Sequence, residues 1–459
     1  MNNTGSNNGA GSAGANRTTP QNTVPKRKVI VEKVGGVDRP FLICVLLLLC
    51  MGTVMVFSSS YPYARAHFDD SYYFAKRHVL FVLAGLGVMW LVVKLVSYRL
   101  LRKWNYLVMG IGLALLVVVL FVGDDTKGAV RWIQIGPITV QPSEIMKFAM
   151  VLFFADYADK FSEKMSLPDD LAGNWKWLTA TVGMLLAAAG AFLLIPDKWA
   201  RIIFAGIFAG ISLWCALHID FKHNLPGIYY GILPYLSLLF VVAVLLALQP
   251  HISGLIIIAA IVFLMMVIGG TKVRYLLTGL VAGCSAVLVL AMSMGHSSTR
   301  IKVWRDPFQY LTGEQKGWQP VQSLYAIGSG GYTGVGFGNS RQKHLYLPEP
   351  QNDYIFSIWC EEMGFIGAVV LMCVFVFFIY RGILIGLRAP DRFSSMLVIG
   401  IVMHVGLQAI LNIAVVTNTL PSTGISLPFF SYGGTALMIL LAEMGVVLSV
   451  SRHSRVENT

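Results

Sequence analysis

The sequence predicts an all-α polytopic membrane protein, and three observations carry this prediction. Of its 459 residues, 56% are hydrophobic and only 13% are charged, whereas a soluble domain usually has about 25% charged residues. The mean hydropathy is +0.67. Apolar runs of about 20 residues, long enough to cross a bilayer as a helix, recur along most of the chain. A soluble two-domain protein is therefore excluded.

We expect about twelve membrane-spanning helices. In chain order they cover residues 40–59, 78–97, 105–122, 141–157, 177–195, 200–217, 228–248, 252–270, 274–294, 353–380, 394–416 and 431–450. The fourth starts around Pro142, which suits the first turn of a helix because its missing N–H costs nothing there. A polar segment, residues 295–352, separates the ninth helix from the tenth and is expected to be a large extracytoplasmic loop.

Two polar tails flank the predicted transmembrane domain, residues 39–453. Residues 1–38 are expected to form a disordered cytoplasmic tail, because the first 25 are rich in Asn, Gly, Ser and Thr. Residues 454–459 are expected to form a short cytoplasmic tail. We expect no cleavable signal peptide, because the first apolar run starts only after Arg39-Pro40.

The distribution of Lys and Arg predicts that both termini are cytoplasmic. In that orientation nineteen of these residues lie on the cytoplasmic side and thirteen outside, and six of the thirteen fall in the 295–352 loop. Cytoplasmic segments of membrane proteins carry the excess of Lys and Arg. The loop would then face outward, where there is no ATP. Chemistry there must use an already activated substrate, such as a lipid-linked pyrophosphate.

The formal charge of +12 does not indicate nucleic-acid binding. Outside the predicted spans there is no basic helix with interleaved base-stacking aromatics, and basic membrane proteins keep Lys and Arg near lipid headgroups. The six cysteines all fall in apolar segments and none forms a CxxC pair. They are expected to be packing residues rather than disulfides or metal ligands.

The first candidate site runs from Lys127 and Arg131 to Glu144 and Lys147. Glu144 lies near the start of the fourth predicted helix, where the helix dipole favours an acid. Lys147 follows three residues later and so shares its face. An acid and a base inside a membrane helix are costly and usually functional. The alternative is a structural ion pair that holds two helices together.

The long loop and its neighbours supply the other candidates. Asp306, before Pro307, could accept a proton from a sugar hydroxyl, although Asp-Pro is also a common turn pair. The glycine-rich run 328–339 is expected to be tightly folded backbone rather than a nucleotide-binding loop. Arg341 and Lys343 follow it as phosphate contacts or as solvated charges. Residues 420–434, which include Ser431, are expected to form a broken or half-inserted helix lining a cavity.

Together these motifs resemble the SEDS family (shape, elongation, division and sporulation proteins), which includes FtsW, RodA and SpoVE. The matching motifs are Lys127-Gly128, Arg131-Trp132, Gln141-Pro142-Ser143-Glu144 with Lys147, Asp306-Pro307, residues 322–331, Leu347-Pro348-Glu349, residues 352–356, residues 361–364 and residues 427–434. They follow the family order over nearly the whole chain. The motif at residues 348–353 is more similar to FtsW or SpoVE than to RodA.

The resemblance implies a peptidoglycan glycosyltransferase that polymerises lipid II on the outer face of the bacterial cytoplasmic membrane during cell division. It implies that Asp306 is the catalytic carboxylate, and that Glu144, Lys147 and Ser431 line the central cavity. It also implies that Lys147 pairs with the catalytic Asp. Our candidates for diphosphate stabilisation are Lys127, Arg131, Arg341 and Lys343.

The resemblance further implies partners: a class B penicillin-binding protein (a transpeptidase) and other division proteins at the septum. A divalent cation, Mg²⁺ or Mn²⁺, is expected as cofactor, and its ligands are unknown. Two departures from the family stand out. His251 replaces the usual Asp of a Gln-Pro-Asp motif, where it could keep a hydrogen bond. Residues 165–225 form a two-helix insert into a family core of ten spans, and this insert leaves Asp306 outside.

Two other classes of function stay open. A transporter that flips lipid II would suit the many spans and the intramembrane Glu144–Lys147 pair, although no inverted repeat is visible. A non-catalytic scaffold that activates the penicillin-binding protein would make Asp306 dispensable.

Overall fold

The computed structural model describes residues 30–457, with internal gaps. The gaps are residues 127–128, 137, 171–172, 278–299, 301 and 312–316, and only scattered residues are described between 177 and 222. Lys127 therefore lies outside the described residues. So does most of the expected helices at 177–195, 200–217 and 274–294.

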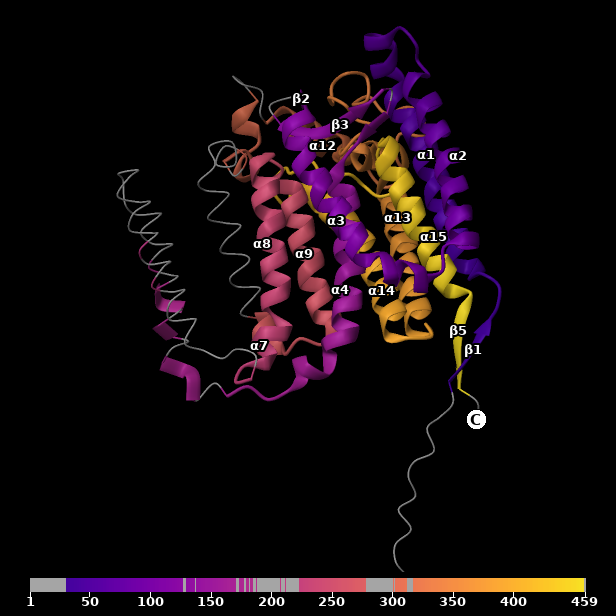
Figure 1. Cartoon of the computed structure of the whole chain (residues 1–459). Coiled ribbons are helices and arrows are strands. Elements are labelled where there is room, and N and C mark those ends of the chain that lie inside the picture. Colours follow the sequence, from indigo (N-terminus) through magenta and orange to yellow (C-terminus); the bar gives the residue numbers. More distant parts are fainter. Residues whose placement is uncertain are drawn as a thin grey trace, which may run out of the picture.

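The described residues confirm a polytopic all-helical membrane protein, built as one bundle of long helices (Figure 1). Eight of the described helices are long and apolar enough to cross a membrane, with the pair α7–α8 counted as one. They are α1 (Arg39–Phe68), α2 (Tyr73–Leu95), α3 (Tyr98–Val122), α7–α8 (Pro226–Gly231 and Leu233–Leu248), α9 (Ile252–Gly269), α13 (Ile355–Leu387), α14 (Arg392–Val416) and α15 (Gly434–Ser451).

Side chains cap the N-termini of α1 and α14. The side chain of Asp38 accepts from the N–H of Phe41 at 2.9 Å and so caps α1. A reciprocal pair of hydrogen bonds between Asp391 and Ser394 forms a capping box at the start of α14. These caps satisfy N–H groups that have no partner inside the helix.

Helix α4 (Pro142–Ser166) lies inside the bundle, packed on α3, α9 and α14, although it is too polar to count among the apolar spans. Its buried Asp156 is neutralised by two cations. Arg102 Nε lies 2.9 Å from Asp156 Oδ1, and Lys160 Nζ lies 2.5 Å from Oδ2. Asn105 also donates to this carboxylate. A buried carboxylate needs such partners, and they allow α4 to stay in the core.

Helices α2 and α15 pack closely because glycines face the contact. Gly85 of α2 lies against Leu441 of α15, and Gly445 of α15 lies against Val92 and the backbone of Met89. Small residues at helix interfaces allow this close approach in membranes.

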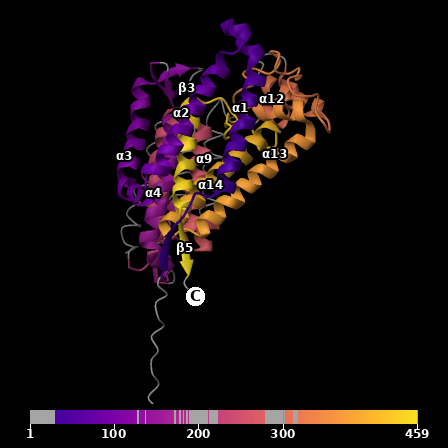
Figure 2. The ribbon, with the colours of Figure 1, turned by 90° about the vertical axis from the view of Figure 1, so that its right-hand side faces the viewer.

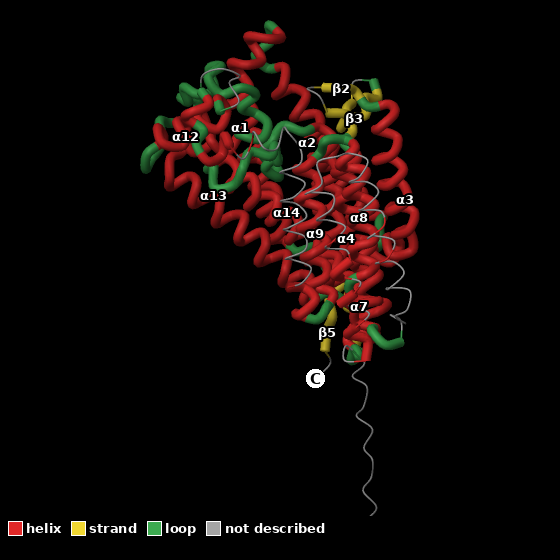
Figure 3. Tube along the Cα trace, turned by 90° about the vertical axis from the view of Figure 1, so that its left-hand side faces the viewer, coloured by secondary structure: helices red, strands yellow, loops and turns green. Residues whose placement is uncertain are grey.

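One end of the bundle, here called the α12 end, carries most of the polar loops (Figure 3). It holds a three-stranded antiparallel sheet of β2 (Asp124–Thr126), β3 (Ala129–Ile135) and β4 (Ile138–Val140), together with helix α12 (Trp318–Gly330) and the 3-10 turn η1 (Phe308–Tyr310). The expected loop 295–352 thus contains a helix. It is amphipathic and too short to span a membrane.

Residues 420–433 differ from the expected half-inserted helix. They form irregular backbone with only turns, and within it Phe429 and Phe430 are buried against α1 and α13. Phe429 has a positive φ of 67°, and its carbonyl oxygen would lie 2.0 Å from a Cβ on Gly52 of α1. The absence of a side chain at Gly52 is what lets this segment lie against the helix.

The opposite end, here called the termini end, joins the two ends of the described chain (Figure 2). Strand β1 (Ile30–Val34) pairs antiparallel with β5 (His453–Glu457). Residues 30–34, within the tail that was expected to be disordered, therefore form a strand. Each strand alternates apolar and polar residues only weakly, so neither is typical of a β-strand. The partner of each strand lies more than 400 residues away, and no local sequence pattern indicates that pairing.

Candidate functional site

Asp306 lies exposed at the α12 end, in a segment that its neighbours hold in place. Its side chain accepts weakly from the N–H of Gln309, at 3.3 Å. Trp304 and Asn418 exchange hydrogen bonds: Trp304 Nε1 donates to the Asn418 carbonyl at 3.0 Å, and Asn418 Nδ2 donates to the Trp304 carbonyl at 3.2 Å. The carboxylate is therefore available to solvent while its backbone is fixed to the turn after α14.

Glu144 and Lys147 form the expected ion pair on one face of α4. Lys147 Nζ lies 2.6 Å from Glu144 Oε2, and only 3% of the lysine side chain is exposed. Lys147 Nζ also donates to Gln408 Oε1 at 2.7 Å, and Gln408 Nε2 donates to the carbonyl of Ser426 at 3.0 Å. The lysine thus links α4 to α14 and to the irregular segment before α15.

A small pocket lies beside this pair. Its volume is about 50 Å³, and its walls include Glu144, Gln408, Ser431 and the buried pair His404 and Glu443. The Ser431 hydroxyl accepts from the N–H of Leu427 at 2.7 Å, so Ser431 also shapes the turn that forms the wall. Glu144 and Ser431 thus share one cavity, as expected, whereas Asp306 lies outside its walls. Lys147 pairs with Glu144 and Gln408 rather than with Asp306.

Arg131 lies half-buried on β3, close to a second arginine. Arg131 Nη2 donates to the carbonyl of Pro250 at 2.7 Å, and Arg300 Nη1 donates to the carbonyl of Ser422 at 3.2 Å. Burial and the like charge of Arg300 lower the pKa of Arg131. Guanidinium groups bind phosphate oxygens well, so both arginines are candidates for anion binding. The sequence does not distinguish Arg300 from the other five basic residues of the 295–352 loop, so it was not among the expected site residues.

His251 does keep hydrogen bonds at the position of the family Asp. Its Nε2 lies 3.2 Å from both Gln141 Nε2 and Ser143 Oγ, and its Nδ1 lies 3.4 Å from Ser253 Oγ. The Gln141 amide nitrogen can only donate, so Nε2 accepts and Nδ1 carries the proton. Burial, with the positive charges of Arg131 and Lys147, lowers the pKa of His251 to about 3. His251 is therefore a neutral tie between α4 and α9.

The glycine-rich run is tightly folded, as expected, and it bridges a break in α13. The backbone leaves helical geometry at Gly364, where φ is 67°. On one side of the break, the carbonyls of Glu361 and Glu362 accept from the N–H groups of Val335 and Gly336, at 2.9 and 3.1 Å. The loop therefore replaces the helical partners that these carbonyls have lost.

The same loop serves the other side of the break. The N–H groups of Phe365 and Ile366 donate to the carbonyls of Gly331 and Tyr332, at 2.9 and 3.1 Å. A Cβ on Gly334 would lie 2.2 Å from a carbonyl oxygen of α13. Only glycine allows the two backbones to approach so closely.

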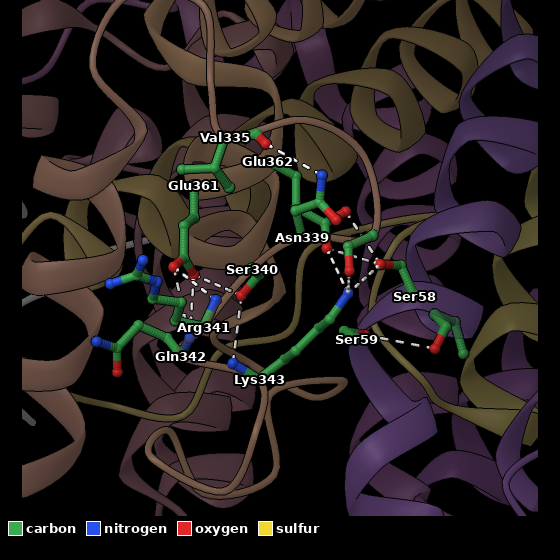
Figure 4. Close-up of polar contacts among 12 residues, drawn as sticks. Ser58, Ser59, Val335, Asn339, Ser340, Arg341, Gln342, Lys343, Glu361 and Glu362 are labelled. Atoms are coloured by element: carbon green, nitrogen blue, oxygen red, sulfur yellow. Dashed lines mark hydrogen bonds and ion pairs between the residues drawn. The ribbon is translucent and has the colours of Figure 1, made fainter.

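Lys343 is buried, so it is neither a diphosphate contact nor a solvated charge. Its Nζ donates to Glu362 Oε1 at 2.8 Å, to Ser58 Oγ at 3.1 Å and to the Gly338 carbonyl at 2.6 Å (Figure 4). Its side chain is 4% exposed and that of Glu362 is 0% exposed. Arg341, in contrast, is exposed and keeps its place as a candidate.

The described side chains do not form a metal centre of their own. No group of three or more His, Cys, Asp or Glu residues gathers among them.

Comparison with known proteins gives consistent results. The chain matches the model of the cell cycle protein family named for FtsW, RodA and SpoVE, over residues 38–225 and 211–456. It is 35% identical over 429 residues to the stage V sporulation protein E of Bacillus subtilis, covering 93% of this chain and 100% of that protein. It is 34% identical to the "probable peptidoglycan glycosyltransferase FtsW" of Geobacter sp., covering 93% and 99%.

Two solved structures have a similar fold. One is a chain of a peptidoglycan synthase complex, with a TM-score of 0.63 and 24% identity, covering 91% of this chain and 98% of that one. The other is the rod shape determining protein RodA of Thermus thermophilus, with a TM-score of 0.57 and 24% identity, covering 91% and 97%. These likenesses concern the arrangement of the helices.

Proposed function

The chain belongs to the FtsW, RodA and SpoVE family of cell cycle proteins, and we propose that it is a peptidoglycan glycosyltransferase that polymerises lipid II. Relatives that carry the name peptidoglycan glycosyltransferase are similar over most of its length. The observation that carries the proposal is Asp306, an exposed carboxylate on a fixed backbone at the polar end of the bundle.

The orientation follows from the charge distribution. We place the α12 end outside the cell and the termini end in the cytoplasm, because Lys and Arg are more numerous at the termini end. Asp306, Arg131 and the pocket beside Glu144 then face the compartment in which glycan strands are assembled.

In the proposed reaction Asp306 acts as general base. Its carboxylate accepts the proton of the acceptor GlcNAc 4-hydroxyl, and that oxygen attacks the anomeric carbon of the donor MurNAc. The bond from this carbon to the diphosphate oxygen breaks, and undecaprenyl diphosphate leaves with the electron pair. Negative charge builds up on the diphosphate as this bond breaks, and nearby cations would stabilise it.

Arg131 and Arg300 are candidate cations for the diphosphate. They lie close enough for their charges to interact, and each is fixed by a hydrogen bond to a backbone carbonyl. The exposed Arg341 is a further candidate, and Lys127 stays a prediction. Excess positive charge would stabilise the charge that develops on the leaving diphosphate.

The role in the cell is part of the proposal. We place the protein in the cytoplasmic membrane at the division septum, working with a class B penicillin-binding protein and other division proteins. A divalent cation, Mg²⁺ or Mn²⁺, stays a prediction. Loss of polymerisation on adding a chelator, with recovery on adding back either ion, would test it.

The deciding experiment is polymerisation of lipid II by the purified protein, with and without its class B partner, resolved on a glycan gel. Asp306→Asn keeps the acceptor oxygen for the Gln309 N–H, so we expect it to fold. It should lower the rate roughly 10²–10⁴-fold, the usual contribution of a general base. Asp70→Asn is a matched control, since Asp70 is an exposed carboxylate in a surface ion pair with Lys76, and surface pairs contribute little.

The same experiment separates the rival functions. Full activity of Asp306→Asn would exclude the proposed mechanism. If a control polymerase works and the wild type makes no glycan, movement of the lipid II headgroup across vesicles would support a transporter. Absence of both, with stimulation of the penicillin-binding protein, would support a scaffold.

A further inference from the structure

A buried polar cluster, here called the α1 lock, joins α1 to the loop after α12. It consists of Ser58, Lys343 and Glu362 (Figure 4). Ser58 Oγ donates to Glu362 Oε1 at 2.7 Å, and Lys343 Nζ lies 2.8 Å from the same oxygen. All three side chains are buried. The lock therefore connects three segments that are far apart in sequence.

A second contact ties the same loop to the neighbouring residue of α13. Glu361, also buried, accepts from Ser340 Oγ at 2.5 Å and from the N–H of Arg341 at 2.9 Å. Two adjacent acids at the end of the first half of α13 thus hold the turn at 340–343. Because the loop also bridges the break at Gly364, the first half of α13 is held from both sides.

The first half of α13 is connected to the Asp306 segment through contacts with α12. Ser323 of α12 donates to the carbonyl of Val416 at 2.7 Å and lies 2.8 Å from Ser357 Oγ of α13. Helix α12 is thereby fixed on the first half of α13 and on α14. The Asp306 segment rests on α12, since the rings of Phe308 and Tyr325 are 6.1 Å apart.

Two more hydrogen bonds connect the start of α12 to the Asp306 segment and to the loop after Lys343. The N–H of Gly317, at the start of α12, donates to the carbonyl of Tyr310 at 3.2 Å. Trp318 Nε1 donates to the carbonyl of Tyr346 at 2.6 Å, three residues after Lys343. A shift of the loop at 343 would therefore move the start of α12 and the turn that carries Asp306.

The energetics favour a positioning role over a stabilising one. A buried ion pair must offset the cost of removing both charges from water, and replacing the whole pair by neutral residues is often neutral for stability. Buried pairs of this kind are better at fixing one arrangement among several. The three donors of Lys343 Nζ all have acceptors, so its position is fully specified.

We propose that the α1 lock is a positioning element of the polymerase. Ser58, Lys343 and Glu362 fix the first half of α13, with α12 packed on it, against α1, and so hold the Asp306 loop in the position that the reaction requires. The inference rests on the proposed function. It assigns to Lys343 and Glu362 an indirect role, carried through α12.

The first test separates positioning from stability. Lys343→Met leaves Glu362 as a buried unpaired charge and should lower both the melting temperature and kcat. The double variant Lys343→Met/Glu362→Gln removes that charge, so its melting temperature should recover. Its kcat should stay roughly 10-fold low, with KM for lipid II within about 2-fold, because the 343 side chain no longer ties the loop to Ser58 of α1 and to residue 362 of α13. Lys76→Met, in an exposed pair at the same end, is the control and should match wild type.

A kcat that recovers together with the melting temperature would overturn the proposal, since the lock would then be structural only. A second measurement does not depend on glycan synthesis. Hydrogen exchange of residues 302–311 should be faster in the double variant than in wild type and in Lys76→Met. Unchanged exchange in that segment would also overturn the proposal, whether or not the wild type makes glycan. Failure of the wild type to make glycan would instead count against the proposed function.

Discussion

At the scale of single residues, the chemistry of a side chain was easier to infer than its surroundings. The sequence placed Glu144 and Lys147 on one face of a helix, and their 2.6 Å ion pair follows from the spacing alone. The same reasoning left Lys343 at the surface, yet it is buried against Glu362 and Ser58. Its partners come from two other helices, one of them 285 residues away in sequence, so no local pattern could show them.

His251 leads to a prediction about pH. Its folded-state pKa is about 3, below the ordinary value of about 6.5. Its contribution to stability is therefore complete above pH 6.5 and is lost as the pH falls toward 3. Between pH 7.5 and pH 5 this loss amounts to about 2 kcal/mol. We expect His251→Gln to remove that part of the pH dependence.

The measurement is the thermal unfolding midpoint of both proteins in detergent at pH 7.5 and pH 5. Between these two pH values the midpoint of the wild type should fall further than that of His251→Gln. Parallel pH dependences in wild type and variant would show that His251 does not titrate as its buried position requires.

At the scale of elements, hydropathy located the described spans but missed how some of them are interrupted. The expected helix at 353–380 is the longer α13, broken at Gly364 and repaired by the loop 331–336. The glycine-rich run indicated tight turns, because positive φ angles favour glycine. Its function as a bridge across the break depends on two segments meeting in space, which the run by itself does not encode.

The bridge makes a prediction with a matched control. Gly334 and Gly338 have nearly equal φ angles, 81° and 80°, so alanine at either position costs about 1–2 kcal/mol of backbone strain. At Gly334 the new Cβ would also meet a carbonyl oxygen of Glu362 at 2.2 Å, whereas at Gly338 nothing lies within 4 Å. Gly334→Ala should therefore destabilise the protein by about 1–3 kcal/mol more than Gly338→Ala.

Thermal unfolding of the two variants side by side checks this. Equal destabilisation would mean that the loop can move away from α13 at little cost, and the bridge would then be loose.

At the scale of the whole molecule, both ends of the predicted insert meet at the termini end. The N–H of Asp170 donates to the carbonyl of Asn224 at 2.8 Å. The buried carboxylate of Asp169 accepts from the N–H of Gly227 at 2.7 Å and from Lys272 Nζ at 2.6 Å. Burial raises the pKa of Asp169, but hydrogen bonds from Lys272, Tyr275 and Gly227 outweigh it and hold the pKa below its usual value.

This geometry predicts that the insert can be removed. Replacing residues 171–222 by a linker of about four Gly and Ser residues should bridge the adjacent ends without strain. The shortened protein should fold and keep its lipid II polymerisation, since the contacts of Asp169 lie outside the deleted segment. A protein that folds but makes no glycan would show that the insert takes part in the reaction.

The sequence by itself determined the class of the protein and the place of each described span, although α1, α4 and α13 run well beyond their expected ends at residues 59, 157 and 380. It also supplied the candidate residues for chemistry. It could do so because apolar runs, caps and short motifs are local, and water and lipid act on each of them separately. Only the tertiary structure decided that Lys343 is buried against Glu362, that Lys147 bonds Gln408, and that a loop bridges the break in α13. These depend on which distant segments pack together, and no local pattern specifies that.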